Sequence, residues 1–85
     1  MSFNLIYRGP GIDEHEYETI TTICKESNFK NQNGAEIANK VKAAINGEWF
    51  VIVSNSGFSY GCTSNKEGDR LIFQINQTAY LIMRI

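Results

Sequence analysis

The feature that most constrains this sequence is a change in the spacing of its apolar residues at Asn46-Gly47. Between Asp13 and this pair, apolar side chains recur at intervals of three and four residues, which is typical of amphipathic helices. After it, they occur in short runs separated by polar turns, which is typical of strands. Helices followed by a set of strands predict an α+β domain with an antiparallel sheet.

Two helices are predicted, and each begins at a capping residue. Asp13 is a good N-cap for the first helix, and Asn33 with Glu36 has the form of a capping box at the start of the second. The apolar stripes expected to be buried are Tyr17, Ile20, Ile23 and Cys24 in the first helix, and Ile37, Val41, Ala44 and Ile45 in the second. Both stripes would face the sheet.

Five strands are predicted, in the order β-α-α-β-β-β-β. Their expected ranges are 3–7, 49–53, 58–62, 70–75 and 78–85. The run Trp49–Val53 is too apolar to alternate, which predicts a strand buried on both faces. The segment Phe58–Cys62 is harder to place, because glycine, serine and cysteine stand where a core strand usually carries β-branched residues.

The size and charge of the protein limit its partners. With 85 residues there is room for one small domain, and oligomerisation is a common remedy for a core of that size. A net charge of −1 argues against nucleic acid or an anionic membrane as the main partner. Without an apolar run of about 20 residues or a basic-then-apolar leader, the sequence predicts an intracellular protein.

No residue pattern predicts catalysis. His15 and Cys24 are nine positions apart on one helix, which places them on opposite faces. Cys24 and Cys62 are too few for a disulfide framework and read as reduced thiols. The loops around Gly34 and Gly68 lack the carboxylates that a calcium loop needs at its ends. We therefore predict no cofactor and no metal, and a thiol enzyme is the weakest hypothesis.

Several short motifs resemble one family. The tail Asn76-Gln-Thr-Ala-Tyr-Leu-Ile-Met-Arg84 resembles the pattern Gly-Gln-Val-Ala-Ile-Leu-Leu-Phe-Lys, and Trp49-Phe-Val-Ile-Val53 resembles Trp-His-Cys-Ile-Val. Ser59-Tyr60 matches a Ser-Tyr pair, and Glu36-Ile-Ala38 resembles Asp-Ile-Ala. Taken in sequence order, these four segments resemble motifs of the eight-kilodalton cytoplasmic dynein light chains. The likeness is dense after Trp49 and diffuse before Gly34.

The resemblance implies a strand-swapped homodimer that binds peptides. The strand at Phe58–Cys62 would cross to the sheet of the other subunit, and its free edge would accept an extended peptide by strand addition. The implied peptide-binding edge is Phe58, Ser59, Tyr60, Gly61, Cys62 and Thr63. The implied groove end and floor are Gly34, Ala35, Glu36, Ile72, Gln74, Ala79 and Leu81. The implied dimer interface is Phe50, Ser56, Gly57, Phe58 and Tyr60.

From the residues alone, an ordinary meander strand at a sheet edge with a glycine bulge stays an equal alternative for this segment. The resemblance would make the protein an accessory subunit of a motor protein. It would be cytoplasmic, would associate with the cytoskeleton and microtubules, and would bind dynein intermediate chain or other light-chain clients.

Departures from the family pattern predict altered binding. Gly34 and Ala35 replace a Glu-Lys pair that helps to grip the peptide, and Ile72 and Gln74 replace two groove tyrosines. Phe50 replaces a histidine whose protonation favours dissociation, so we expect a dimer that persists in mild acid. Divergent domains of this kind also end EF-hand calcium-binding proteins of the flatworm tegument. A dimerisation domain of such a protein, with an empty groove, is the alternative function.

Overall fold

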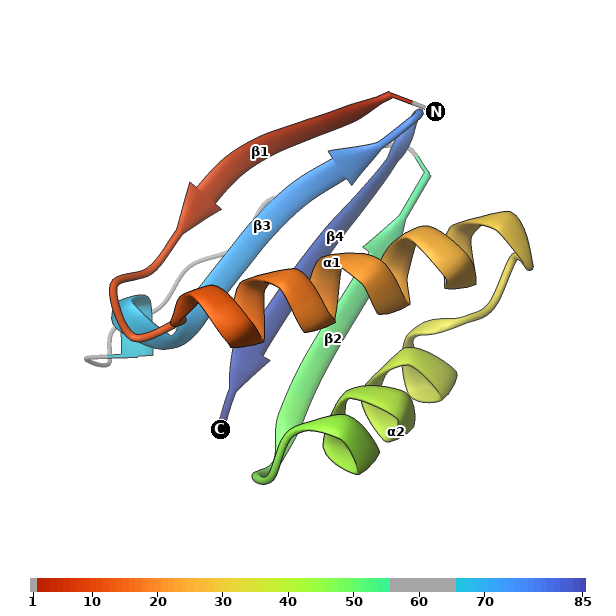
Figure 1. Ribbon diagram of the computed structural model, residues 1–85. Coiled ribbons are helices and arrows are strands. Elements are labelled where there is room, and N and C mark those ends of the chain that lie inside the picture. The colour runs from red at the N-terminus through yellow and green to blue at the C-terminus, as the bar shows by residue number, and fades with distance from the viewer. Residues whose placement is uncertain (1, 56–65) are drawn as a thin grey trace.

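The computed structural model describes residues 2–55 and 66–85. Its helices and strands are β1 (Phe3–Arg8), α1 (Glu14–Phe29), α2 (Gly34–Ala44), β2 (Trp49–Ser54), β3 (Arg70–Ile75) and β4 (Thr78–Arg84), with a 3-10 turn, η1 (Lys66–Asp69), ahead of β3 (Figure 1). The predicted α+β class, with two helices between the first strand and the others, is confirmed. The strand predicted at 58–62 lies outside the described residues.

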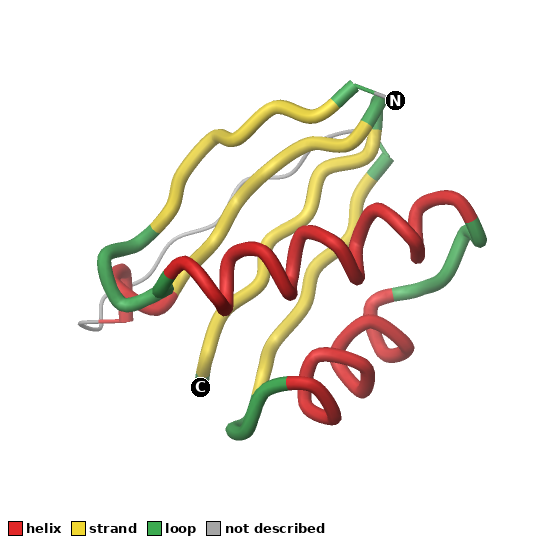
Figure 2. Tube along the Cα trace, in the orientation of Figure 1, coloured by secondary structure: helices red, strands yellow, loops and turns green. Residues whose placement is uncertain are grey.

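The four described strands form one antiparallel sheet in the order β1-β3-β4-β2. Figures 1 and 2 show both helices on the same side of this sheet, with α1 crossing its centre and α2 beside β2. We call the side that carries the helices the inner face and the other side the outer face. β1 and β2 are the two edges of the described sheet.

Both predicted helix starts are confirmed as capping boxes. The main-chain N–H of Glu16 donates to the Asp13 side chain at 2.8 Å, and the Asp13 N–H donates to Glu16 Oε1 at 3.0 Å. Asn33 and Glu36 exchange the same two bonds at 2.9 and 3.1 Å. Each box satisfies main-chain donors that the first helical turn leaves without partners.

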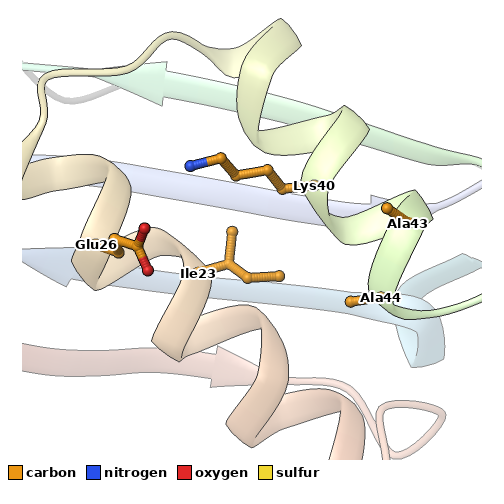
Figure 3. Close-up of a pocket in the computed structure, with 5 residues that line it drawn as sticks. All are labelled: Ile23, Glu26, Lys40, Ala43 and Ala44. Atoms are coloured by element: carbon orange, nitrogen blue, oxygen red, sulfur yellow. The ribbon is translucent and has the colours of Figure 1, made fainter.

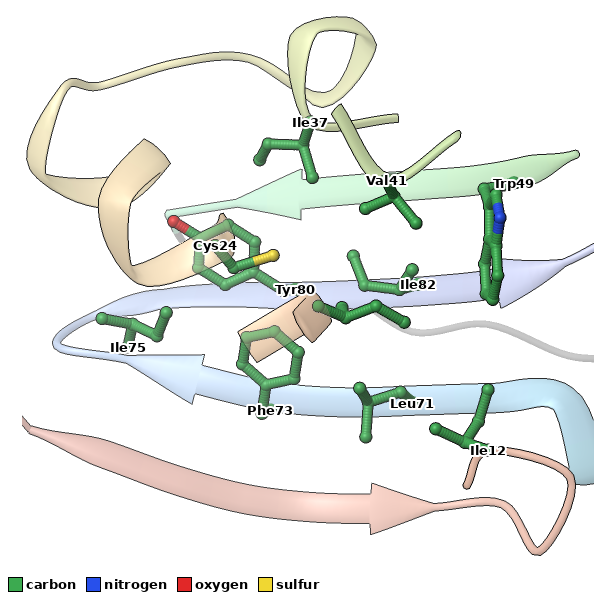
Figure 4. Close-up of a cluster of buried hydrophobic side chains, with 11 residues drawn as sticks. Ile12, Cys24, Ile37, Val41, Trp49, Leu71, Phe73, Ile75, Tyr80 and Ile82 are labelled. Atoms are coloured by element: carbon green, nitrogen blue, oxygen red, sulfur yellow. The ribbon is translucent and has the colours of Figure 1, made fainter. Parts of the chain in front are cut away.

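The core lies between the helices and the inner face of the sheet (Figure 4). Its buried members are Ile12, Ile20, Cys24, Ile37, Val41, Trp49, Leu71, Phe73, Ile75, Tyr80 and Ile82. The Phe73 and Tyr80 rings stack at 5.4 Å between centroids. The Tyr80 hydroxyl accepts a hydrogen bond from Asn28 Nδ2 at 2.9 Å, so this buried polar group is paired.

Two burial predictions are wrong. Ala44 is exposed, because α2 ends at this residue and Ile45 already has an extended backbone. Strand β2 is not buried on both faces: Phe50 is 44% exposed. The reason is that β2 lies at the edge of the described sheet, where Val51 and Val53 pack against the core while Phe50 and Ile52 point to the outer face.

The end of β4 is tied to two other elements by Arg84. Its guanidinium pairs with Glu16 of α1 and, at 3.1 Å, with Asp69 of η1. It also lies over the Trp49 ring, 4.7 Å from the ring centroid. These contacts hold the first turn of α1 against the end of the sheet. Among the described residues, neither helix is long and apolar enough to span a membrane.

Candidate partner-binding edge and outer face of the sheet

Strand β2 has a hydrogen-bonded neighbour on one side only among the described strands. The Ile85 N–H donates to the Glu48 carbonyl at 2.9 Å, so these two residues form a hydrogen-bonded pair. The next pair along the ladder is Trp49 with Arg84. Because bonded and non-bonded pairs alternate in an antiparallel ladder, Phe50 and Ile52 direct their main-chain groups toward β4. Trp49, Val51 and Val53 therefore direct theirs away from the sheet.

The two edges differ in regularity. On β1 the register with β3 shifts between Leu5 and Tyr7, which is a bulge. Bulges at edge strands discourage the addition of another strand. On β2 all six residues from Trp49 to Ser54 pair with β4 without a shift. β2 is therefore the better template for an added strand.

The start of α2 lies beside the β2 edge. Gly34 is its first residue, and a Cβ added there would lie 3.2 Å from the Val51 carbonyl oxygen. The missing side chain lets the helix approach the outward-facing main chain of β2 closely. Ala35 and Glu36 follow on the exposed surface, and the Glu36 carboxylate is held by the capping box.

The outer face of the sheet is largely apolar. The strand register places Tyr7, Ile72, Leu81 and Ile52 in one row across the four strands. The next row contains Arg70, Met83 and Phe50. Tyr7 is 37% exposed and Phe50 44%, whereas Ile72 and Leu81 are 4% and 2% exposed. The accessible apolar surface of this face is therefore largest at its margins, and one margin is β2.

The predicted groove residues occupy two separate places. Ile72, Gln74, Ala79 and Leu81 all lie on the outer face, since they alternate with Leu71, Phe73 and Ile75 on the inner face as expected. Gly34, Ala35 and Glu36 lie in the helical layer beside β2. Within one protomer these two sets therefore lie in different layers of the fold.

The remaining predicted site residues fall outside the described part of the sequence. They are Ser56, Gly57, Phe58, Ser59, Tyr60, Gly61, Cys62 and Thr63. Phe50 is the one predicted dimer-interface residue that the structure describes. Its exposure on the outer face fits that prediction and does not test it.

Cys24 cannot act as a nucleophile in the folded state. Its side chain is fully buried in the core, and burial raises the pKa of its thiol to about 12. The reactive form of a cysteine is the thiolate, which is negligible near neutral pH at such a pKa.

His15 lies on the exposed surface of α1. In the ranges 2–55 and 66–85, no group of three His, Cys, Asp or Glu residues could hold a metal ion.

A shallow groove between α1 and α2 was not predicted. It has a volume of about 370 Å³ and is lined by Ile23, Glu26, Lys40, Ala43 and Ala44 (Figure 3). The two alanines leave room between the helices, and their adjacency at the end of α2 is the sequence signal. The Lys30 ammonium, 3.0 Å from Glu26, lowers the pKa of that carboxyl, and Lys40 adds to the effect. Of the lining side chains, Glu26 and Lys40 are charged and the other three are apolar.

Comparison with known proteins yields no family model that matches this sequence and no curated protein that matches it. A functional interpretation therefore depends on the resemblance of the short motifs and on the geometry of the β2 edge.

Proposed function

We propose that this protein is a non-enzymatic interaction module: a homodimer similar to dynein light chains, which binds extended peptide segments of partner proteins by strand addition. The observation that carries the proposal is the regular edge of β2, which has no neighbour among the described strands on its outward side and includes the exposed Phe50. Main-chain groups supply the hydrogen bonds in strand addition, so an edge with outward-directed N–H and C=O groups is the essential requirement.

On this proposal, residues 58–62 of each copy pair along β2 of the other copy. The apolar outer face then becomes a shared surface, with Phe50 near its centre. Strand pairing alone is weak in water, and an apolar face must be buried with it for stable association. The other edge of residues 58–63 would bind the peptide. Clients would be segments of cytoskeletal proteins, such as dynein intermediate chain.

Two observations favour a second candidate, a dimerisation domain with an empty or altered groove. Two of the predicted floor residues, Ile72 and Leu81, are almost fully buried in the protomer. In addition, Gly34 and Ala35 offer no charged side chain to a peptide. On this alternative the domain joins two copies of a larger protein, such as a tegumental EF-hand protein, and binds no client.

Amide hydrogen exchange within β2 tests the shared part of both candidates. Val51 and Val53 have outward N–H groups, whereas Phe50 and Ile52 have inward ones, so one strand contains its own control. We expect all four amides to be protected at high protein concentration. On dilution below the dimer dissociation constant, only Val51 and Val53 should lose protection. Fast exchange of Val51 and Val53 at every concentration would contradict strand addition at this edge.

Peptide titration separates the two candidates. A panel of Thr-Gln-Thr peptides and a displayed random library would be tested against the dimer. Binding at micromolar affinity, about −8 kcal/mol, supports the peptide-binding module. A dimer that binds no peptide in either set is the outcome expected for the dimerisation domain. The exposed Ala35→Lys variant serves as a probe, because it returns a cation to the groove end without touching the core.

A further inference from the structure

The dipeptide Asn-Gly occurs twice in the sequence, at Asn33-Gly34 and Asn46-Gly47. Asparagine is thermolabile in proteins, and glycine after it offers no side chain that hinders attack by its main-chain nitrogen. The two Asn-Gly dipeptides are chemically identical, but their backbones and hydrogen bonds differ. Comparing them shows which asparagine the fold protects from this attack.

The fold restrains Asn33. Its Oδ1 atom accepts from the Glu36 N–H at 2.9 Å, and its own N–H donates to Glu36 Oε1 at 3.1 Å. Its carbonyl accepts from the Ile37 N–H at 3.1 Å, and its ψ is 175°. Cyclisation onto Gly34 requires both the side chain and ψ to rotate away from these positions. The capping box opposes that rotation.

No such restraint acts on Asn46. It lies on the exposed connection between α2 and β2, after the helix has ended at Ala44. None of the hydrogen bonds or ion pairs of the described residues includes its side chain. Gly47 is also exposed and has a φ of 119°, in the region that favours glycine.

We infer that Asn46 is a site of spontaneous deamidation in the folded protein, whereas Asn33 is protected by its capping box. The Gly47 main-chain nitrogen attacks Cγ of Asn46, so a new N–C bond forms and the bond between Cγ and Nδ2 breaks. The amide nitrogen leaves as ammonia with the proton from Gly47, and a succinimide remains. Water opens this ring at either carbonyl, giving aspartate or isoaspartate without any oxidant or reductant.

The modification would alter the connection that leads into β2. Either product adds a negative charge two residues before Glu48, whose carboxylate lies 2.8 Å from Lys42 Nζ. Isoaspartate also adds one methylene to the main chain between α2 and β2. This inference depends only on the described residues and not on the proposed function.

The test is incubation of the purified full-length protein at mildly alkaline pH and physiological temperature, followed by peptide mapping. Mass spectrometry locates the deamidated residue, and an isoaspartyl methyltransferase labels the isoaspartate. We expect Asn46 to react roughly tenfold faster than Asn33, since an N-cap contributes about the free energy that corresponds to that ratio. In urea, where the capping box is lost, the two rates should become equal.

Two variants make the result specific. Asn46→Gln should remove most of the product while leaving the fold intact, because the residue is exposed in a loop. Glu36→Ala removes half of the capping box and should accelerate deamidation at Asn33 without changing the rate at Asn46. Equal rates at both asparagines in the folded protein would overturn the inference. A faster reaction at Asn33, or an Asn46 that survives while the urea sample reacts, would overturn it as well.

Discussion

The inner and outer faces of the sheet are formed by the same strands but are completed differently. On the inner face, Leu71, Phe73 and Ile75 are fully buried under the two helices. On the outer face, Ile72 and Leu81 are also nearly buried, at 4% and 2% exposed, whereas the aromatic residues at its margins, Phe50 and Tyr7, remain 44% and 37% exposed. A single layer of helices can bury only one face of a sheet. The inner face therefore forms the core of the protomer, whereas the exposed margin of the outer face at Phe50, with the β2 edge, is the part that we propose for a partner.

The largest effect is expected on the inner face. Phe73→Ala should lower the free energy of unfolding by about 3–5 kcal/mol, because it leaves a cavity beside Tyr80. Chemical denaturation measures the loss, which should not depend on protein concentration. Phe29→Ala is the matched control: Phe29 is 86% exposed at the end of α1, and its truncation should change stability by less than about 0.5 kcal/mol. A similar loss in both variants would contradict the assigned core.

The next effect is expected on the outer face. Phe50→Asp should weaken association by roughly 2 kcal/mol or more, since it places a charge in the centre of the proposed interface. The protomer should remain folded, because Phe50 lies outside the core. Sedimentation velocity of this variant is compared with Phe29→Asp, which should associate like the wild type. An unchanged sedimentation coefficient for Phe50→Asp would remove this residue from the interface.

The same residue gives a prediction for the acid response of the proposed dimer. Phe50 has no titratable group, so protonation cannot separate two copies at this position. The dimer should therefore persist at mildly acidic pH. Sedimentation velocity measures this. Dissociation at mildly acidic pH would contradict the prediction and would show that another group at the interface titrates.

A smaller effect is expected at the hydroxyl of Tyr80. Tyr80→Phe removes the acceptor for Asn28 Nδ2 in the last turn of α1 and should cost about 1 kcal/mol. The loss should appear in chemical denaturation at every protein concentration, as for Phe73. A stability equal to that of the wild type would mean that solvent satisfies Asn28 equally well.

The smallest effect concerns the buried thiol of Cys24. Burial raises the pKa of its thiol from 9.0 to about 12, so the unfolded state loses this proton first as the pH rises. The thiol contribution to stability is therefore constant well below pH 9 and falls as the pH rises through this value, by roughly 0.4 kcal/mol at pH 9. The difference in stability between wild type and Cys24→Ala, measured against pH, should show this decline. A flat difference up to pH 10 would contradict the assigned burial.

Sequence patterns were sufficient where local physics decides the structure. The helix starts at Asp13 and Asn33 were predictable, because a capping box involves residues only three positions apart. The alternation of Ile72 with Phe73 was predictable for the same reason, since neighbouring residues of a strand point to opposite faces.

Other features depend on contacts between distant segments and were not predictable. An apolar run such as Trp49–Val53 is the same whether its second face is buried by its own protomer or by another molecule, so the exposure of Phe50 could not be deduced. Similarly, nothing near Gly34 in the sequence reveals that the Val51 carbonyl lies against it. The alternation of Ile72 and Gln74 with core residues could be predicted, but the position of Gly34 beside β2 could not.

The mass of the protein in solution tests the central claim most directly. Sedimentation equilibrium at neutral pH measures it without a label and without assumptions about shape. The proposed pairing of two copies along β2 predicts a mass twice that of the 9.6 kDa protomer. A mass equal to that of one protomer, maintained at high protein concentration, would contradict it.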